Sequence, residues 1–171
     1  MGCLLVVGLV LFVFLLNVFN VYTLEFNIKE NETIVVECGT SNEVPKVEVL
    51  YKGTLLNKAG KYVDVKVDGE VNLNQIGTYP VTYYASYKGL DASMQTMIEV
   101  KDTTPPEIQL VINKDSFTSP IAQYVEEGYT AVDKCDGDLT SQVIREERDG
   151  IVYYTVSDSS GNQATAERKI V

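Results

Sequence analysis

The stretch that decides the fold is residues 151–162, which read Ile-Val-Tyr-Tyr-Thr-Val-Ser-Asp-Ser-Ser-Gly-Asn. Val152, Tyr154 and Val156 fall on one side of an extended chain, and a turn rich in Asp, Ser and Gly follows them. A similar run, Val-Thr-Tyr-Tyr-Ala-Ser-Tyr-Lys-Gly, occupies residues 81–89. We therefore expect two copies of one unit, a strand with a buried face followed by a tight turn and a closing strand.

Other segments outside these two runs also alternate between apolar and polar residues. The segments are residues 46–51, 62–67 and 107–112, and residues 80–85 and 151–156 of the two runs alternate in the same way. All are short, rich in β-branched residues and Tyr, and separated by Gly, Asp, Asn and Pro. Alternation of this kind is typical of half-buried strands, and no stretch of a dozen residues carries a helical apolar stripe. The pattern predicts an all-β chain built from antiparallel sandwiches, with Val81, Tyr83 and Ala85 on the buried face of the earlier run.

A domain boundary is predicted at residues 101–108, Lys-Asp-Thr-Thr-Pro-Pro-Glu-Ile. Two successive prolines fix φ and cannot donate to a sheet, so they favour a stiff extended joint. We therefore divide the soluble part into residues 25–101 and residues 102–171. The second domain stops inside its expected last strand, from which we expect the natural chain to continue.

Residues 1–24 have no charged side chain and are almost uniformly apolar. A helix needs about 20 such residues to cross a bilayer core of roughly 30 Å. The run predicts one N-terminal transmembrane helix. A cleaved signal peptide is the alternative, but the stretch is long and lacks a small-x-small cleavage site, which favours a retained anchor.

Composition excludes several functions. The 171 residues include no His and no Trp, which removes the usual general base and the Ser-His-Asp and His-containing zinc sites. Lys and Arg number 14 against 24 Asp and Glu, a formal charge of −10, so nucleic acid is not an expected partner. We predict that the chain is not an enzyme.

Three motifs occur in order in the second half: Asp-Thr-Thr-Pro-Pro-Glu-Ile-Gln-Leu at residues 102–110, Glu-Gly-Tyr-Thr-Ala-Val-Asp-Lys-Cys-Asp-Gly-Asp-Leu-Thr at 127–140, and Tyr-Thr-Val-Ser-Asp-Ser-Ser-Gly-Asn-Gln-Ala-Thr-Ala at 154–166. Together they resemble the bacterial Ig-like domain named after a pesticidal crystal protein, which is related in layout to hyalin-repeat modules. The first half keeps only Gly-Thr-Tyr-Pro-Val-Thr-Tyr at 77–83 and resembles a divergent copy. The resemblance implies two tandem antiparallel Ig-like β-sandwiches after the N-terminal helix.

The resemblance implies that the protein is a non-catalytic spacer or adhesion module on a bacterial cell surface. The protein would be a single-pass membrane protein with extracytoplasmic Ig-like domains, whose partners are the membrane and a surface protein or polysaccharide. Such modules also precede enzymes that act on cell-wall polysaccharide, including polysaccharide deacetylases, so an enzyme's N-terminal stalk is one alternative. A carbohydrate-binding surface protein is another.

One cluster of residues could carry chemistry. Asp133, Asp136 and Asp138 belong to one predicted turn, and Asp158 opens another; such connections project from the same end of an Ig-like sandwich. Four converging carboxylates favour a cation, and Ca²⁺ prefers oxygen ligands. The more ordinary explanation is that these side chains close turns by accepting hydrogen bonds from their own backbone. No other cofactor is expected.

The eleven Tyr residues could stack on sugars, although core packing explains most of them. Tyr84 and Tyr153 are the candidates for ligand binding, because both are predicted on the outward face of a strand.

The three cysteines are spread over the three predicted segments. Cys3 lies in the apolar run, Cys38 in the first domain and Cys135 in the second. No disulfide within a domain is therefore expected, and a bridge between two chains through Cys38 or Cys135 is the alternative.

Overall fold

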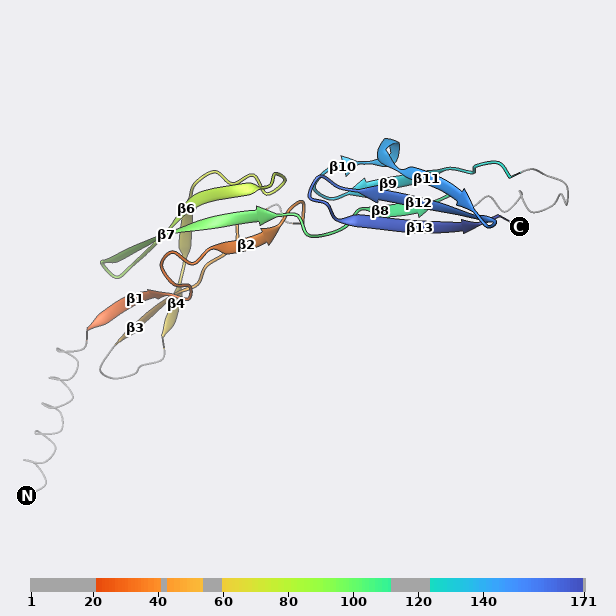
Figure 1. Ribbon diagram of the computed structural model, residues 1–171. Coiled ribbons are helices and arrows are strands. Elements are labelled where there is room, and N and C mark those ends of the chain that lie inside the picture. Colours follow the sequence, from red (N-terminus) through yellow and green to blue (C-terminus); the bar gives the residue numbers. More distant parts are fainter. Residues whose placement is uncertain (1–20, 41–42, 54–59, 112–123, 171) are drawn as a thin grey trace, which may run out of the picture. The chain divides into compact units, whose positions relative to one another are not determined.

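The computed structural model describes residues 21–40, 43–53, 60–111 and 124–170 (Figure 1). The strands of the first half are β1 (Tyr22–Phe26), β2 (Ile34–Glu37), β3 (Val49–Gly53), β4 (Lys61–Val63), β5 (Val65–Asp68), β6 (Gly77–Tyr87) and β7 (Leu90–Lys101). Those of the second half are β8 (Glu107–Leu110), β9 (Tyr129–Asp133), β10 (Gly137–Asp138), β11 (Ile144–Arg148), β12 (Ile151–Ser157) and β13 (Gln163–Lys169), with one 3₁₀ turn, η2 (Thr140–Gln142). The all-β prediction is confirmed for this part of the chain.

The predicted transmembrane helix lies mostly outside the described residues. Among the residues that are described, no helix is long and apolar enough to cross a membrane. The predicted end of the helix is wrong, because residues 22–24 belong to β1 and pair antiparallel with β3. The Tyr22 ring stacks on Tyr51 of β3 with ring centroids 5.0 Å apart. Tyr and Thr favour strands, which accounts for the extended structure of residues 22–24.

The chain forms two compact units that do not follow a single cut in the sequence. Unit 1 comprises Met1–Ile34, Val44–Asn72 and Thr78–Glu99, and unit 2 comprises Val35–Glu43, Leu73–Gly77 and Val100–Val171. Unit 2 thus takes two short segments from the half that precedes residue 102.

Unit 1 is built around strands β6 and β7. They lie side by side, with β5 next to β6, and β1, β3 and β4 form a three-stranded sheet (Figure 1). The predicted buried face of β6 is confirmed, because Val81, Tyr83 and Ala85 are all buried while Tyr84 between them is exposed. The Tyr83 hydroxyl donates a hydrogen bond to the carbonyl of Pro45 at 2.7 Å, which satisfies its one polar group inside the core.

Unit 2 holds two three-stranded antiparallel sheets, β10-β9-β8 and β11-β12-β13. The predicted face of β12 is confirmed: Val152 and Tyr154 have no exposed surface, and Val156 is 2% exposed. A core cluster joins the two sheets, with members from β8, β9, β12, β13 and the η2 region. Its residues are Ile108, Ala131, Leu139, Val143, Val156 and Ala164.

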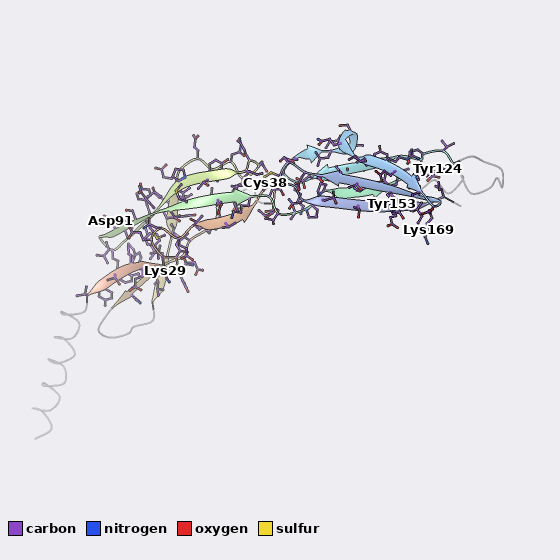
Figure 2. All side chains as sticks on the ribbon, in the orientation of Figure 1. Lys29, Cys38, Asp91, Tyr124, Tyr153 and Lys169 are labelled. Carbon is purple, nitrogen blue, oxygen red and sulfur yellow. A yellow bond between two sulfur atoms is a disulfide. The ribbon has the colours of Figure 1, made fainter. Side chains whose placement is uncertain are left out.

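A disulfide joins Cys38 to Cys135, so the prediction of no disulfide within a domain is wrong. Cys38 is labelled in Figure 2. The error came from assigning Cys38 to the first domain, whereas residues 35–43 fold with unit 2. The Cys38 amide donates to the carbonyl of Lys101 at 2.7 Å. At Gly39, where φ is +70°, a Cβ would lie 2.2 Å from the carbonyl oxygen of Lys134, so this close approach requires glycine.

Candidate functional site

The turn between β9 and β10 is closed by the first of the predicted aspartates. Asp133 accepts hydrogen bonds at Oδ1 from the amides of Cys135 and Asp136, at 2.7 and 2.9 Å. Gly137 follows with φ of +77°, a conformation that costs glycine little. Asp133 therefore makes the turn-closing bonds that its sequence context predicts.

A second turn, between β12 and β13, meets the first. The Ser159 amide donates to Oδ2 of Asp136 at 2.6 Å, and the Ser159 hydroxyl donates to Oδ1 at 2.9 Å. Asp158 is nearly buried and accepts from the amide and the side-chain nitrogen of Asn162, both at 2.8 Å. The two turns therefore lie at the same end of unit 2, as the sequence predicted.

A carboxylate that the sequence interpretation missed, Asp102, completes the cluster. One oxygen each from Asp102, Asp133 and Asp136 lies within 4.8 Å of the others. Asp102 is 8% exposed, and neither of its carboxylate oxygens has a hydrogen-bond partner. These three residues are called the acidic cluster below.

Burial raises the pKa of Asp102, and the nearby carboxylates of Asp133 and Asp158 raise it further. The Ser160 hydroxyl and the Thr104 amide act in the opposite direction. Neither of them meets the geometry of a hydrogen bond to Asp102, so the carboxylate stays unpartnered.

Asp138 lies apart from the acidic cluster. Its Oδ1 accepts a hydrogen bond from the amide of Thr140 at 2.9 Å, and its side chain is exposed. The hydrogen bonds from Thr140 hold the pKa of Asp138 below its usual value. The structure thus brings together Asp133, Asp136 and Asp158 of the four predicted metal ligands, and Asp138 instead accepts a hydrogen bond from the start of η2.

The segment that contains Asp102 is held by a carboxylate from β2. Glu37 accepts hydrogen bonds from the Thr103 amide at 2.7 Å, the Thr103 hydroxyl at 2.8 Å and the Thr104 amide at 3.1 Å. These bonds, led by that of the Thr103 backbone, lower the pKa of Glu37 against the opposing effect of burial. Residues 102–104 therefore have a fixed conformation in which the Asp102 carboxylate lies near those of Asp133 and Asp136.

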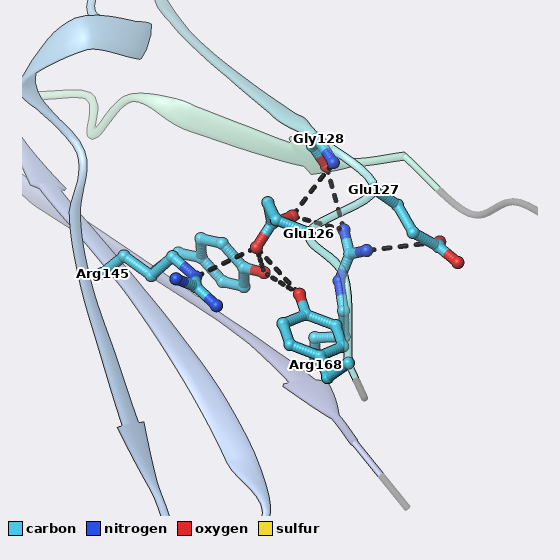
Figure 3. Close-up of polar contacts among 7 residues, drawn as sticks. Glu126, Glu127, Gly128, Arg145 and Arg168 are labelled. Atoms are coloured by element: carbon cyan, nitrogen blue, oxygen red, sulfur yellow. Dashed lines mark hydrogen bonds and ion pairs between the residues drawn. The ribbon is translucent and has the colours of Figure 1, made fainter. Parts of the chain in front are cut away.

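A second polar network surrounds Glu126 (Figure 3). The hydroxyls of Tyr124 and Tyr154 both donate to Oε2 of Glu126, at 2.8 and 2.7 Å. Two guanidinium groups pair with the same carboxylate, Arg145 at 3.0 Å and Arg168 at 3.5 Å. Burial acts to raise the pKa of Glu126, but the hydrogen bonds and Arg168 outweigh it and hold the pKa below its usual value.

The Tyr154 hydroxyl of this network is closed to solvent. Burial raises the pKa of Tyr154 far above its usual value, and its side chain has no exposed surface, so a substrate has no access to the hydroxyl. Arg168 also bonds the Gly128 carbonyl at 2.9 Å and Glu127 at 3.2 Å, which ties β13 to the segment before β9.

The two predicted ligand-binding tyrosines lie in different surroundings. Tyr84, on β6, is 45% exposed and borders two shallow hollows of unit 1, of about 610 and 600 Å³. Tyr153, on β12, is half-buried, and the Arg148 guanidinium lies 5.0 Å from its ring centroid. One face of Tyr153 is therefore covered, and Tyr84 keeps more surface for a ligand.

Comparison with known proteins places the first half in a family. Residues 26–100 match the family model described as "Bacterial surface protein, Ig-like domain". This part of the chain is therefore an Ig-like domain of the bacterial surface type, and it is the half that the sequence described as the divergent copy. The pesticidal-crystal type of Ig-like domain for residues 102–171 stays a prediction.

The search of curated proteins found no match. Among solved structures, the chain is similar to a lipoprotein of Bacteroides thetaiotaomicron, with 18% sequence identity and a TM-score of 0.30. The alignment covers 78% of this chain, which spans 60% of that lipoprotein.

Proposed function

We propose that this chain is a non-catalytic module of the bacterial cell surface, which serves as a spacer or adhesive segment outside the membrane. The observation that carries the proposal is the match of residues 26–100 to an Ig-like domain of bacterial surface proteins. In this proposal unit 2 is a second Ig-like domain of the pesticidal-crystal type, and the apolar residues 1–24 supply a single membrane anchor.

Three further observations support this proposal. The Cys38–Cys135 disulfide favours a location outside the reducing cytoplasm, where such bonds persist. The Tyr-Glu-Arg network, whose residue types could serve acid–base chemistry, is satisfied by hydrogen bonds and ion pairs among its own members. Two antiparallel sheets over one core also suit a passive structural unit.

The two alternative functions are the stalk of an enzyme and a carbohydrate-binding protein. The stalk of a cell-wall enzyme requires a catalytic domain elsewhere in the polypeptide. Carbohydrate binding draws its support from Tyr84, which is exposed beside two hollows.

A tagged protein tests the spacer role. An epitope tag placed directly after Val171 is expected to be labelled by antibody on intact cells. Deletion of residues 25–171 should lower that labelling several-fold at equal total protein, because the tag then lies against the envelope. An unrelated pair of Ig-like domains inserted at the same place should restore it.

Equal labelling of the deletion and the intact protein would contradict the spacer proposal. If the unrelated pair restores labelling but cells lose attachment to their usual surface, the module acts as an adhesive segment. Total tag measured by immunoblot is the control for expression.

A further inference from the structure

We propose that Asp102, Asp133 and Asp136 bind a Ca²⁺ ion, with the carboxylate of Asp158 contributing charge beside it. The inference does not rest on the proposed function.

The decisive observation is the state of Asp102. A carboxylate removed from water needs hydrogen-bond donors or a counter-charge, since an isolated buried charge is costly. Asp102 is 8% exposed, yet both of its oxygens lack a partner and one of them faces the oxygens of Asp133 and Asp136. A bound cation supplies the missing counter-charge.

The distances suit Ca²⁺. Its oxygen ligands lie about 2.3–2.6 Å from the ion, so two ligands on opposite sides are about 5 Å apart. One oxygen from each residue of the acidic cluster lies within 4.8 Å of the others, which is inside the span that the ligands of one such ion cover. Mg²⁺ demands near-ideal octahedral geometry and gives up its water ligands reluctantly, so a site of protein carboxylates suits it less well.

The other two carboxylates retain capacity for a ligand. Both described hydrogen bonds to Asp133 go to Oδ1, which leaves Oδ2 available. The oxygens of Asp136 each accept one bond from Ser159, and a carboxylate oxygen has lone pairs for two partners. Among the described residues, no Lys or Arg forms an ion pair with any of these carboxylates.

The ion would connect three parts of unit 2. Asp102 precedes β8, Asp133 and Asp136 flank the turn from β9 to β10, and Asp136 is bonded to the turn after β12. Glu37 already fixes the residues next to Asp102, so the site is largely preorganised. Ca²⁺ would act there as a cross-link in addition to the disulfide.

Urea unfolding of the full chain in a mild non-ionic detergent tests the proposal, with 5 mM CaCl₂ compared with EDTA. For a site of the affinity typical of extracellular modules, with Kd on the order of 10⁻⁴–10⁻³ M, Ca²⁺ should raise the folding equilibrium constant about 6- to 50-fold. MgCl₂ at the same ionic strength should have a much smaller effect. Isothermal titration with CaCl₂ should give a stoichiometry of one.

Two variants should differ in how their stability responds to Ca²⁺. Asp102→Asn removes the unpartnered charge, so it should be more stable than wild type in EDTA and should lose the response to Ca²⁺. Asp138→Asn, an exposed aspartate outside the acidic cluster, should keep the full response. If Asp102→Asn does not fold, Asp136→Asn serves in its place and should also lose the response.

Three results would overturn the proposal. They are an unchanged wild-type midpoint at 5 mM CaCl₂, an equal response in Asp102→Asn, and an equal effect of MgCl₂, which would indicate general screening of charge.

Discussion

Replacement of both Cys38 and Cys135 by Ala should lower the free energy of unfolding of unit 2 by about 4 kcal/mol. The disulfide joins residues 97 positions apart, and a cross-link over a loop of this length restricts the unfolded chain strongly. The buried Cys38 side chain also packs at the place where Gly39 passes against Lys134.

Hydrogen exchange measures this effect within unit 2 itself. Amides of β9 and β12 should exchange about a thousand-fold faster in the double variant, since 1.4 kcal/mol corresponds to a factor of ten. Reduction of the wild-type protein should give the same result, and Cys3→Ala should leave these rates unchanged. A change of less than ten-fold would contradict a stabilising role for the disulfide.

Glu126→Gln should lower the free energy of unfolding by about 2 kcal/mol at neutral pH. The substitution keeps the size of the side chain but removes the charge that pairs with Arg145 and Arg168. Arg168 is 12% exposed and would lose part of its counter-charge, whereas Arg145 is 37% exposed and is partly screened by solvent. The expected loss is therefore below that of a fully buried pair.

The loss of stability in Glu126→Gln should also depend on pH, which gives a second measurement of the same effect. The pKa of Glu126 is lower in the folded chain than its ordinary value of 4.5. Its stabilising contribution is therefore complete above the unfolded pKa and is lost as the pH falls through the folded pKa. The difference between wild type and Glu126→Gln should narrow as the pH falls below 4.5.

Chemical unfolding between pH 3 and pH 7 checks this, with Glu146→Gln as a matched control. Glu146 is an exposed neighbour on β11, and its replacement should cost less than about 0.5 kcal/mol. A pH-independent difference for Glu126→Gln would show that the lost contacts are not those of a carboxylate.

Local patterns were enough to predict strands β6 and β12 and their buried faces. Period-two alternation placed Tyr83 and Tyr154 inside correctly, because the side chain of a strand residue is directed by its register alone. The same alternation was the available signal at Tyr22–Leu24, but the apolar run that precedes these residues concealed it.

Contacts over long sequence distances could not be predicted in this way. The Cys38–Cys135 bond was missed because a linear boundary at residue 102 separates the two cysteines, whereas residues 35–43 fold with unit 2. Asp102 was interpreted as part of a linker, since nothing local shows that its carboxylate faces Asp133. Glu126 gave no signal either, because its partners come from β11, β12 and β13 as well as its own segment.

We propose that the chain is a disulfide-bonded surface module outside the cytoplasm. Thiol trapping in native cells tests this proposal most directly. Cells are quenched in acid, the proteins are denatured, and free thiols are tagged with a maleimide polymer that shifts the band on a gel. The account predicts that Cys38 and Cys135 are protected and that prior reduction adds two further adducts. Tagging of both cysteines without reduction would show a reduced protein and contradict the account.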